Sequence, residues 1–209
     1  MLRAMTERPL RVEPVILGGE HVRLEPLSID HLPGLIAIGL DPAIWTWMPL
    51  RVQSADHMRD LFAAALAARD KGIEFPFVTV DRASGRPVGS SRYLAIALEH
   101  ARIEIGWTWI VPAFQRSAVN TEAKLLMLGH AFEALGCQRV EFKTDAQNGP
   151  SRRALLGIGA TFEGVFRKHM LVRGGERRDS AWYSITDDEW PDVRAHLRAR
   201  LARPRPAAG

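Results

Sequence analysis

One polar loop in this sequence runs from an apolar strand into a helix, within "VPAFQRSAVNTEAKLLML" at residues 111–128. The first turn of a helix has free N–H groups and a positive dipole end, so it can hold an anion without lysine or metal. The loop has no glycine and lacks the Gly-Lys-Ser/Thr ending of a nucleoside-triphosphate loop. These residues alone leave an anion site and an ordinary capped helix equally open.

A second helix start whose side chains could take part in chemistry lies at Asn148–Ser151, "NGPS". A serine hydroxyl at such a position is a capable donor to a bound group. Asparagine and serine are also common N-cap residues, and one helix start can serve both purposes.

Glu104, in "IEIGW", stands between apolar residues of a predicted strand. A carboxylate is costly to bury there without a partner. It can be a general base, or it can pair with an arginine such as Arg102 or Arg92. The sequence leaves both interpretations open.

The elements that must position these groups follow from periodicity and turn residues. The sequence predicts helices over 28–40, from Ser54 or Asp56 to about 71, from the polar loop to about 135, from 148–151 onward, and from Asp187 or Asp188. It predicts strands over 21–27, 75–81, 87–97, 101–111, 139–144, 161–172 and 177–185. Consecutive hairpins exclude a doubly wound parallel sheet, but one β–α–β connection needs a parallel pair. We expect an α/β (α+β) fold with a mixed, mostly antiparallel sheet of about six to seven strands, flanked by helices on both faces.

Composition limits the class of protein. The 209 residues suit one domain, and 46% hydrophobic residues allow a sizeable core. The single cysteine, Cys137, excludes an internal disulfide, and the seven histidines show no metal-ligand spacing, so we expect no metal. The pI of about 9.7 reflects arginines near both ends, which we interpret as solvated tails rather than a nucleic-acid surface. Without a membrane span or signal peptide, we expect a soluble cytoplasmic protein.

Three segments together resemble the GNAT N-acetyltransferase superfamily, over roughly residues 20 to 190. They are "IEIGWTW", "PAFQRSAVNTEAKLLMLGHAFEALGCQRVEFKTDAQNGPSRRALLGIGATFEG" and "GGERRDSAWYSITDDEWP". The likeness is greatest to its RimJ/RimL-like branch, which acetylates N-terminal amines of ribosomal proteins. The resemblance implies a GNAT domain over 19–186, with an N-terminal extension over 1–18 and a C-terminal helix and basic tail over 187–209.

The resemblance also implies acetyl-coenzyme A (acetyl-CoA) as co-substrate. The family's Q/R-x-x-G-x-G/A loop, whose N–H groups hold the pyrophosphate, falls on 115–120, with Ala118 and Asn120 in the glycine places. In the family's N-x-x-S element, Asn148 would contact pantetheine and Ser151 would protonate the thiolate. The implied coenzyme-binding residues are Trp109, Ile110, Val111, Gln115, Arg116, Ser117, Ala118, Val119, Asn120, Thr121, Asn148 and Ser151.

For catalysis the resemblance implies Glu104 as base, because an amine is largely protonated at neutral pH. The amine would attack the thioester directly, with a backbone N–H of the strand at 107–111 stabilising the oxyanion. Cys137 is expected to be a small buried residue rather than a nucleophile.

The acceptor cleft would have Trp45, Trp47 and Met48 on one wall and Tyr183 on the other. For the tryptophans, plain core packing is the alternative. Strand alternation puts Trp107 and Trp109 on one face and Glu104, Gly106 and Thr108 on the other, unless a bulge intervenes.

The predicted function is acetyl transfer to a primary amine, either a protein N-terminus or a small molecule. The alternative is a catalytically weak or inactive acyl-CoA-binding module. We expect no membrane or nucleic-acid partner, and a homodimer stays open. The sequence does not choose the acceptor.

Overall fold

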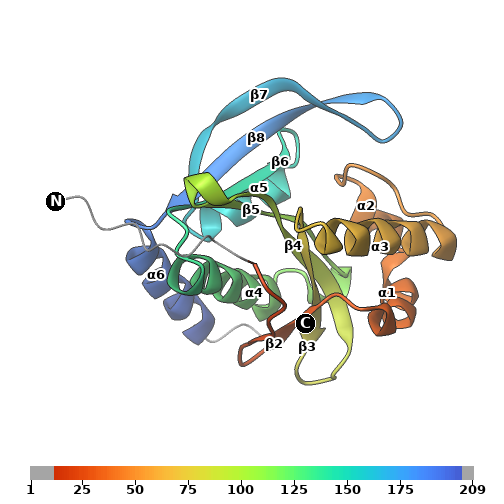
Figure 1. Ribbon diagram of the computed structural model, residues 1–209, viewed down its shortest axis with the longest axis horizontal. Helices are drawn as coiled ribbons and strands as arrows, with labels where there is room; N and C mark the ends of the chain where they lie inside the picture. The colour runs from red at the N-terminus through yellow and green to blue at the C-terminus, as the bar shows by residue number, and fades with distance from the viewer. Residues whose placement is uncertain (1–11, 204–209) are drawn as a thin grey trace.

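Eight strands form one sheet in the computed structural model, which describes residues 12–203 (Figure 1). Of the predicted N-terminal extension (1–18) and C-terminal helix and basic tail (187–209), residues 1–11 and 204–209 lie outside the described residues. In spatial order the strands are β1 (Leu17–Gly18), β2 (Val22–Pro26), β3 (Phe75–Asp81), β4 (Pro87–Ala97), β5 (Arg102–Ile110), β6 (Arg139–Asp145), β8 (Glu176–Thr186) and β7 (Thr161–Val172). The β5–β6 pair is parallel and the others are antiparallel, which confirms the predicted fold class. The sheet has one strand more than the predicted six to seven, because β1, which is only two residues long, was not predicted.

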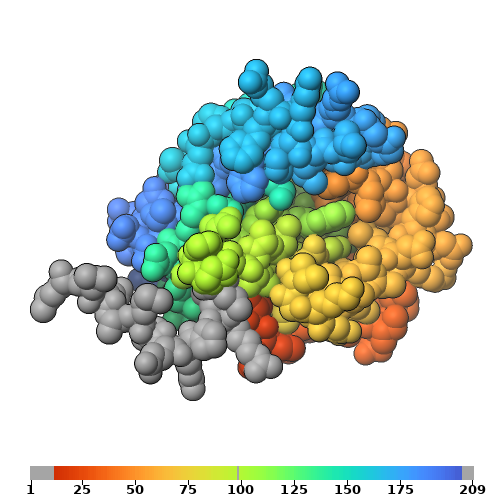
Figure 2. All heavy atoms as spheres, turned by 45° about the horizontal axis from the view of Figure 1, so that its top comes forward, coloured from red at the N-terminus to blue at the C-terminus, as the bar shows by residue number. Residues whose placement is uncertain are grey.

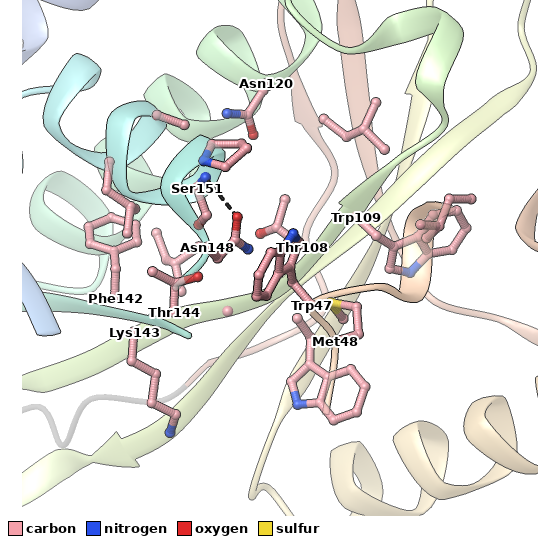
Figure 3. A pocket seen from close by; sticks show the side chains of 18 of the residues that line it. Trp47, Met48, Thr108, Trp109, Asn120, Phe142, Lys143, Thr144, Asn148 and Ser151 are labelled. Carbon is pink, nitrogen blue, oxygen red and sulfur yellow. Dashed lines mark hydrogen bonds between the residues drawn. The ribbon is translucent and has the colours of Figure 1, made fainter. Parts of the chain in front are cut away.

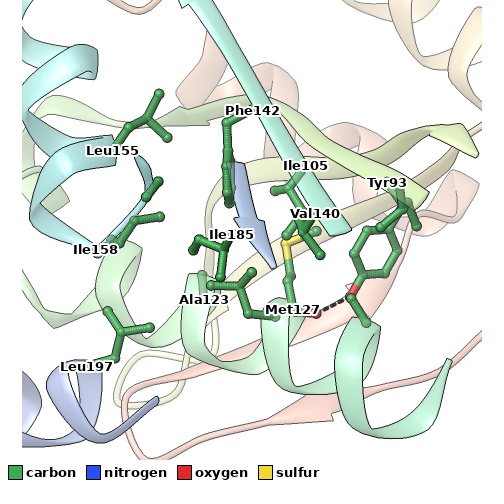
Figure 4. Close-up of a cluster of buried hydrophobic side chains, with 14 of the residues drawn as sticks. Tyr93, Ile105, Ala123, Met127, Val140, Phe142, Leu155, Ile158, Ile185 and Leu197 are labelled. Carbon is green, nitrogen blue, oxygen red and sulfur yellow. Dashed lines mark hydrogen bonds between the residues drawn. The ribbon is translucent and has the colours of Figure 1, made fainter. Parts of the chain in front are cut away.

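Helices cover both faces of the sheet. They are α1 (Leu32–Gly39), α2 (Pro42–Trp45), α3 (Ala55–Asp70), α4 (Ala118–Gly129), α5 (Gly149–Gly157) and α6 (Trp190–Ala202). One buried cluster joins α1–α3 to β3, and the larger one joins α4–α6 to the middle strands (Figure 4). Within the described residues, no helix combines the length and apolar character needed to cross a membrane.

Local chemistry sets the helix ends. The Ser54 side chain accepts the N–H of His57 to cap α3, and Gly72 follows that helix with φ +68°. Beyond α4, a π-helical turn over His130–Ala134 continues to the predicted end. The last helix begins at Trp190, later than predicted, because the Glu189 carboxylate accepts the N–H of Thr186 at 2.8 Å and holds the intervening residues in a turn.

The parallel pair splits after three residues. Arg102–Glu104 pairs with Arg139–Glu141, and beyond that point β5 pairs only with β4 while β6 pairs only with β8. The two strands therefore open a wedge in the middle of the sheet, starting at Glu104.

A bulge in β5 changes which side chains share a face. Gly106 pairs with Arg92 and Trp109 with Ser90, so two residues of β5 oppose one of β4, and Trp107 has φ +50°. Trp109 consequently packs against Trp45 at a ring distance of 5.7 Å. The predicted alternation was therefore wrong beyond Gly106, because the extra residue inverts it.

That inversion turns Thr108 toward α4, where its Oγ1 accepts from Lys124 at 2.8 Å. Glu104 stays on the opposite face, together with Trp107 and Trp109. The bulge is therefore what separates the threonine from the carboxylate.

The long β7–β8 hairpin arches over this face of the sheet (Figures 1 and 2). At its tip, the Arg173 N–H donates to Pro49 O at 2.7 Å, and the Arg173 guanidinium donates to Met48 O at 3.2 Å. The hairpin is thereby tied to the loop after α2, which closes one side of the wedge.

Candidate active site

A cavity of about 1040 Å³ occupies the wedge between β5 and β6 (Figure 3). Its walls come from the loop after α2, from β5, from the first turns of α4 and α5, from β6 and from the β7–β8 hairpin. Because Glu104 lies on one face of the sheet and α4 and α5 cover the other, the cavity connects the two faces.

The polar loop forms one end of this cavity. Arg116 has φ +58°, and the Ser117 side chain caps α4 by accepting the Val119 N–H at 3.2 Å and donating to Phe114 O at 2.6 Å. Ala118 and Asn120 lie inside the helix, so neither needs glycine's backbone freedom. The one left-handed residue is Arg116, and the rest of the first turn keeps its free N–H groups.

The second helix start faces the same space. The Asn148 side-chain oxygen accepts the Ser151 N–H at 3.1 Å, so Asn148 is an N-cap of α5. Both residues also line the cavity. Among the described residues, the Ser151 hydroxyl has no hydrogen-bond partner, which leaves it available to a ligand.

Glu104 lies at the apex of the wedge and is only 2% exposed. Burial raises the pKa of its carboxyl, while the charge and the hydrogen bond of Lys143 Nζ at 3.0 Å oppose that rise. Neither predicted arginine is its partner: Arg102 pairs with Glu141 and Arg92 with Glu74.

Lys124 is a wall residue that the sequence did not single out. It is 4% exposed, and its ammonium contacts two hydroxyls, Thr108 Oγ1 at 2.8 Å and Ser91 Oγ at 3.3 Å. Burial without a carboxylate lowers the pKa of Lys124 to about 7. Its spacing of four from Asn120 puts both side chains on one face of α4.

Most of the predicted side chains meet at this cavity, but some do not. Those that line it are Glu104, Trp47, Met48, Trp109, Ile110, Gln115, Arg116, Asn120, Asn148 and Ser151. Val111, Ser117, Ala118, Val119 and Thr121 belong to the neighbouring backbone and do not line it. Trp45 is buried, with its indole N–H donating to Gly39 O at 2.7 Å. Tyr183 is buried too, and its hydroxyl accepts from Arg152 at 3.0 Å.

Cys137 lies outside this site. Its side chain is buried, and burial raises its pKa to about 12, which suits packing rather than nucleophilic attack. No metal-binding group of three or more His, Cys, Asp or Glu side chains occurs within residues 12–203.

Comparisons with known proteins identify the family of this chain. Residues 21–161 match the family model described as an acetyltransferase (GNAT) domain. The curated relative YoaA of Bacillus subtilis (strain 168), called an uncharacterized N-acetyltransferase, is 31% identical over 134 residues, covering 64% of this chain and 73% of its own.

Solved structures share the whole fold. A GCN5-related N-acetyltransferase from Brucella melitensis is 34% identical, with a TM-score of 0.88 over 96% of this chain and 91% of its own. The RimJ protein of Mycobacterium smegmatis is 23% identical, with a TM-score of 0.73 over 86% and 88% of the two chains, which is a likeness of fold. The chain therefore belongs to the GNAT family of acetyltransferases and is an acetyl-CoA-dependent acyltransferase.

Proposed function

We propose that this chain transfers an acetyl group from acetyl-CoA to a primary amine, with both substrates bound at once on opposite sides of the split sheet. The observation that carries the proposal is the cavity itself. It joins two helix starts on one face of the sheet to a buried carboxylate, Glu104, on the other. A donor and an acceptor can therefore meet between β5 and β6 without a covalent enzyme intermediate.

The residues at the helix starts fit a coenzyme. The first turn of α4 offers N–H groups and a positive dipole end to the pyrophosphate, and Arg116 and Arg153 add positive charge to the same cavity. Asn120 and Ser151 both line the cavity, and we assign the wall between them to the pantetheine arm. The RimJ structure with a similar fold was solved in complex with CoA-disulfide, which supports this assignment.

The chain's own groups would handle the protons. Glu104, with its raised pKa, takes the proton that the attacking amine loses. The unpartnered Ser151 hydroxyl hydrogen-bonds the sulfur and passes it a proton, which solvent then returns to the serine. Bound acetyl-CoA supplies an activated acyl carbon and a good leaving group. A backbone N–H of β5 near the bulge is suited to stabilise the negative charge on the carbonyl oxygen.

The acceptor stands on the side of Glu104, between Trp47 and Met48 on one wall and the β7–β8 hairpin on the other. Trp45 and Tyr183 are buried and pack behind the residues that line the cleft. They support the shape of the cleft rather than contact the substrate.

Thiol release tests the proposal. The protein is incubated with acetyl-CoA and with a panel of small amines and N-terminal peptides, and free thiol and acceptor mass are followed. We expect thiol release that requires an acceptor and equals the acetylated product. Saturable binding of acetyl-CoA with no release for any acceptor would instead establish the inactive binding module.

A further inference from the structure

Arg178 of β8 is a buried cation that lacks a hydrogen-bonded partner among the described residues. It is 5% exposed and lines the cavity, yet its guanidinium makes no hydrogen bond or ion pair with any residue of 12–203. Its Nε atom is fully enclosed with no acceptor. A buried unpaired charge is costly, and functional sites are where such a cost is tolerated.

The carboxylates near Arg178 are already engaged. Asp145 accepts the Gln147 N–H at 3.0 Å and lies 3.6 Å from the guanidinium of Arg173. Glu104 is paired with Lys143 at 3.0 Å. With these pairs formed, neither carboxylate hydrogen-bonds the Arg178 guanidinium, although the charges of Asp145 and Glu104 attract it from further away.

The charge of Arg178 also acts on a neighbouring histidine, His169. Burial lowers the pKa of His169, and the charges of Lys143 and Arg178 lower it further. The His169 ring shares a hydrogen bond with Ser180 at 3.1 Å rather than with any acid. His169 therefore lies close enough to Lys143 and Arg178 for their charges to act on it.

We propose that the acceptor is an amine that also carries a carboxylate, and that Arg178 binds this carboxylate. The idea rests on the proposed function, because it places the amine at Glu104 and the second group at Arg178 in the same cavity. A carboxylate supplies the hydrogen-bond acceptor that the Arg178 guanidinium lacks, and its two oxygens match the planar fork of an arginine. Polyamines and aminoglycoside-like compounds bring further positive charge and would be repelled.

Met170 pairs with Arg178 across β7 and β8, and both line the cavity. With Trp47 and Met48 it gives this end an apolar surround, in which a charge-assisted hydrogen bond is stronger than in water. The carboxylate has two natural sources, a free amino acid and an acidic side chain near a peptide N-terminus.

Matched acceptors test the inference on the wild-type protein. Initial rates of thiol release are compared for free amino acids against their amides, for Ala-Asp-amide against Ala-Asn-amide, and for spermidine. If the acceptor is a free amino acid, its kcat/KM should be about ten- to a hundredfold above that of its amide; if it is an acidic peptide, Ala-Asp-amide should exceed Ala-Asn-amide by the same factor. The pair that shows this preference identifies whether the natural acceptor is a free amino acid or a peptide.

Two substitutions assign the preference to Arg178. Arg178→Met is expected to raise KM for the carboxylate acceptor to that of the amide, and Arg178→Lys to keep part of the preference. Arg177→Met is the matched control, because Arg177 is the exposed neighbour on β8 and does not line the cavity. Arg178→Met should also raise the melting temperature, since it removes an unpaired buried charge, whereas loss of a structural arginine would lower it.

The outcomes separate the two claims. If amides or spermidine are acetylated as well as the carboxylates, the inference fails while acetyl transfer stands. If Arg178→Met keeps the wild-type preference, Arg178 is not the carboxylate site. If no amine of any kind is acetylated, the proposed function fails and this inference fails with it.

Discussion

Replacing Lys124 with methionine should raise the free energy of unfolding at neutral pH and make that free energy depend less on pH. The side chain extends from α4 and is buried against β4 and β5, and its only polar contacts within residues 12–203 are the hydroxyls of Thr108 and Ser91. Methionine fills a similar volume, and the two hydroxyls can still bond each other across their present 2.7 Å. Lys124→Met therefore removes a buried amine without leaving an orphaned group.

The magnitude follows from the pKa. Folding lowers the pKa of Lys124 from 10.5 to about 7, so between these values the unfolded chain binds one proton more than the native protein. The lysine's contribution to stability therefore rises with pH across this window and is lowest below pH 7. At about 1.36 kcal/mol per pH unit, the lysine costs up to about 5 kcal/mol at pH 7 and about 2 kcal/mol at pH 9.

Urea unfolding at pH 7, 8 and 9 measures this difference. We expect the stability advantage of Lys124→Met over the wild type to shrink by about 2 to 3 kcal/mol from pH 7 to pH 9. Lys71→Met is the control, because Lys71 is exposed at the end of α3, and its curve should run parallel to the wild type. An advantage that is absent, or that does not change with pH, would refute the burial of an unpaired amine.

Three further substitutions test Glu122, a buried carboxylate of α4 that binds the backbone of residues 20–22, and the two proposed proton-transfer groups. Glu122→Ala should lower the free energy of unfolding by about 3 kcal/mol or more, measured by urea unfolding, because its buried carboxylate accepts three backbone N–H groups at 2.6–2.8 Å. An unchanged midpoint would contradict that role. Glu104→Gln should lower kcat by about a hundredfold and abolish the inflection that the raised pKa of this carboxyl gives the acid limb of the pH–rate profile. An unshifted profile would remove Glu104 as the base. Ser151→Ala should lower kcat by about tenfold or more with little change in KM for acetyl-CoA, and unchanged turnover would remove it as the acid.

Strand alternation and turn residues predicted most of the fold. The hairpin strands at 87–97 and 161–172 have the predicted bounds, because "SG" and "GG" turns and apolar alternation are local signals. The two-residue strand β1 carries no such signal, since it exists only through its pairing with β2.

The site was only partly predictable, and the reasons are tertiary. The helix starts at 115–120 and 148–151 are local patterns, and they do line one cavity. The bulge at Trp107 has no sequence signature here, yet it decides that Trp109 faces the core and Thr108 faces α4. Arg178 looks like one more arginine in "ERRDS", and only the register of β7 with β8 brings it into the cavity.

Direct transfer in a ternary complex is the central claim, and one mass measurement tests it most directly. The protein is mixed with acetyl-CoA that carries an isotope-labelled acetyl group, first alone and then with an amine acceptor from the thiol-release panel. The account predicts an unchanged intact protein mass without acceptor, and one labelled acetyl group on the acceptor after it is added. A labelled protein that passes its acetyl group to the acceptor, or thiol release at an equal rate without acceptor, would contradict it.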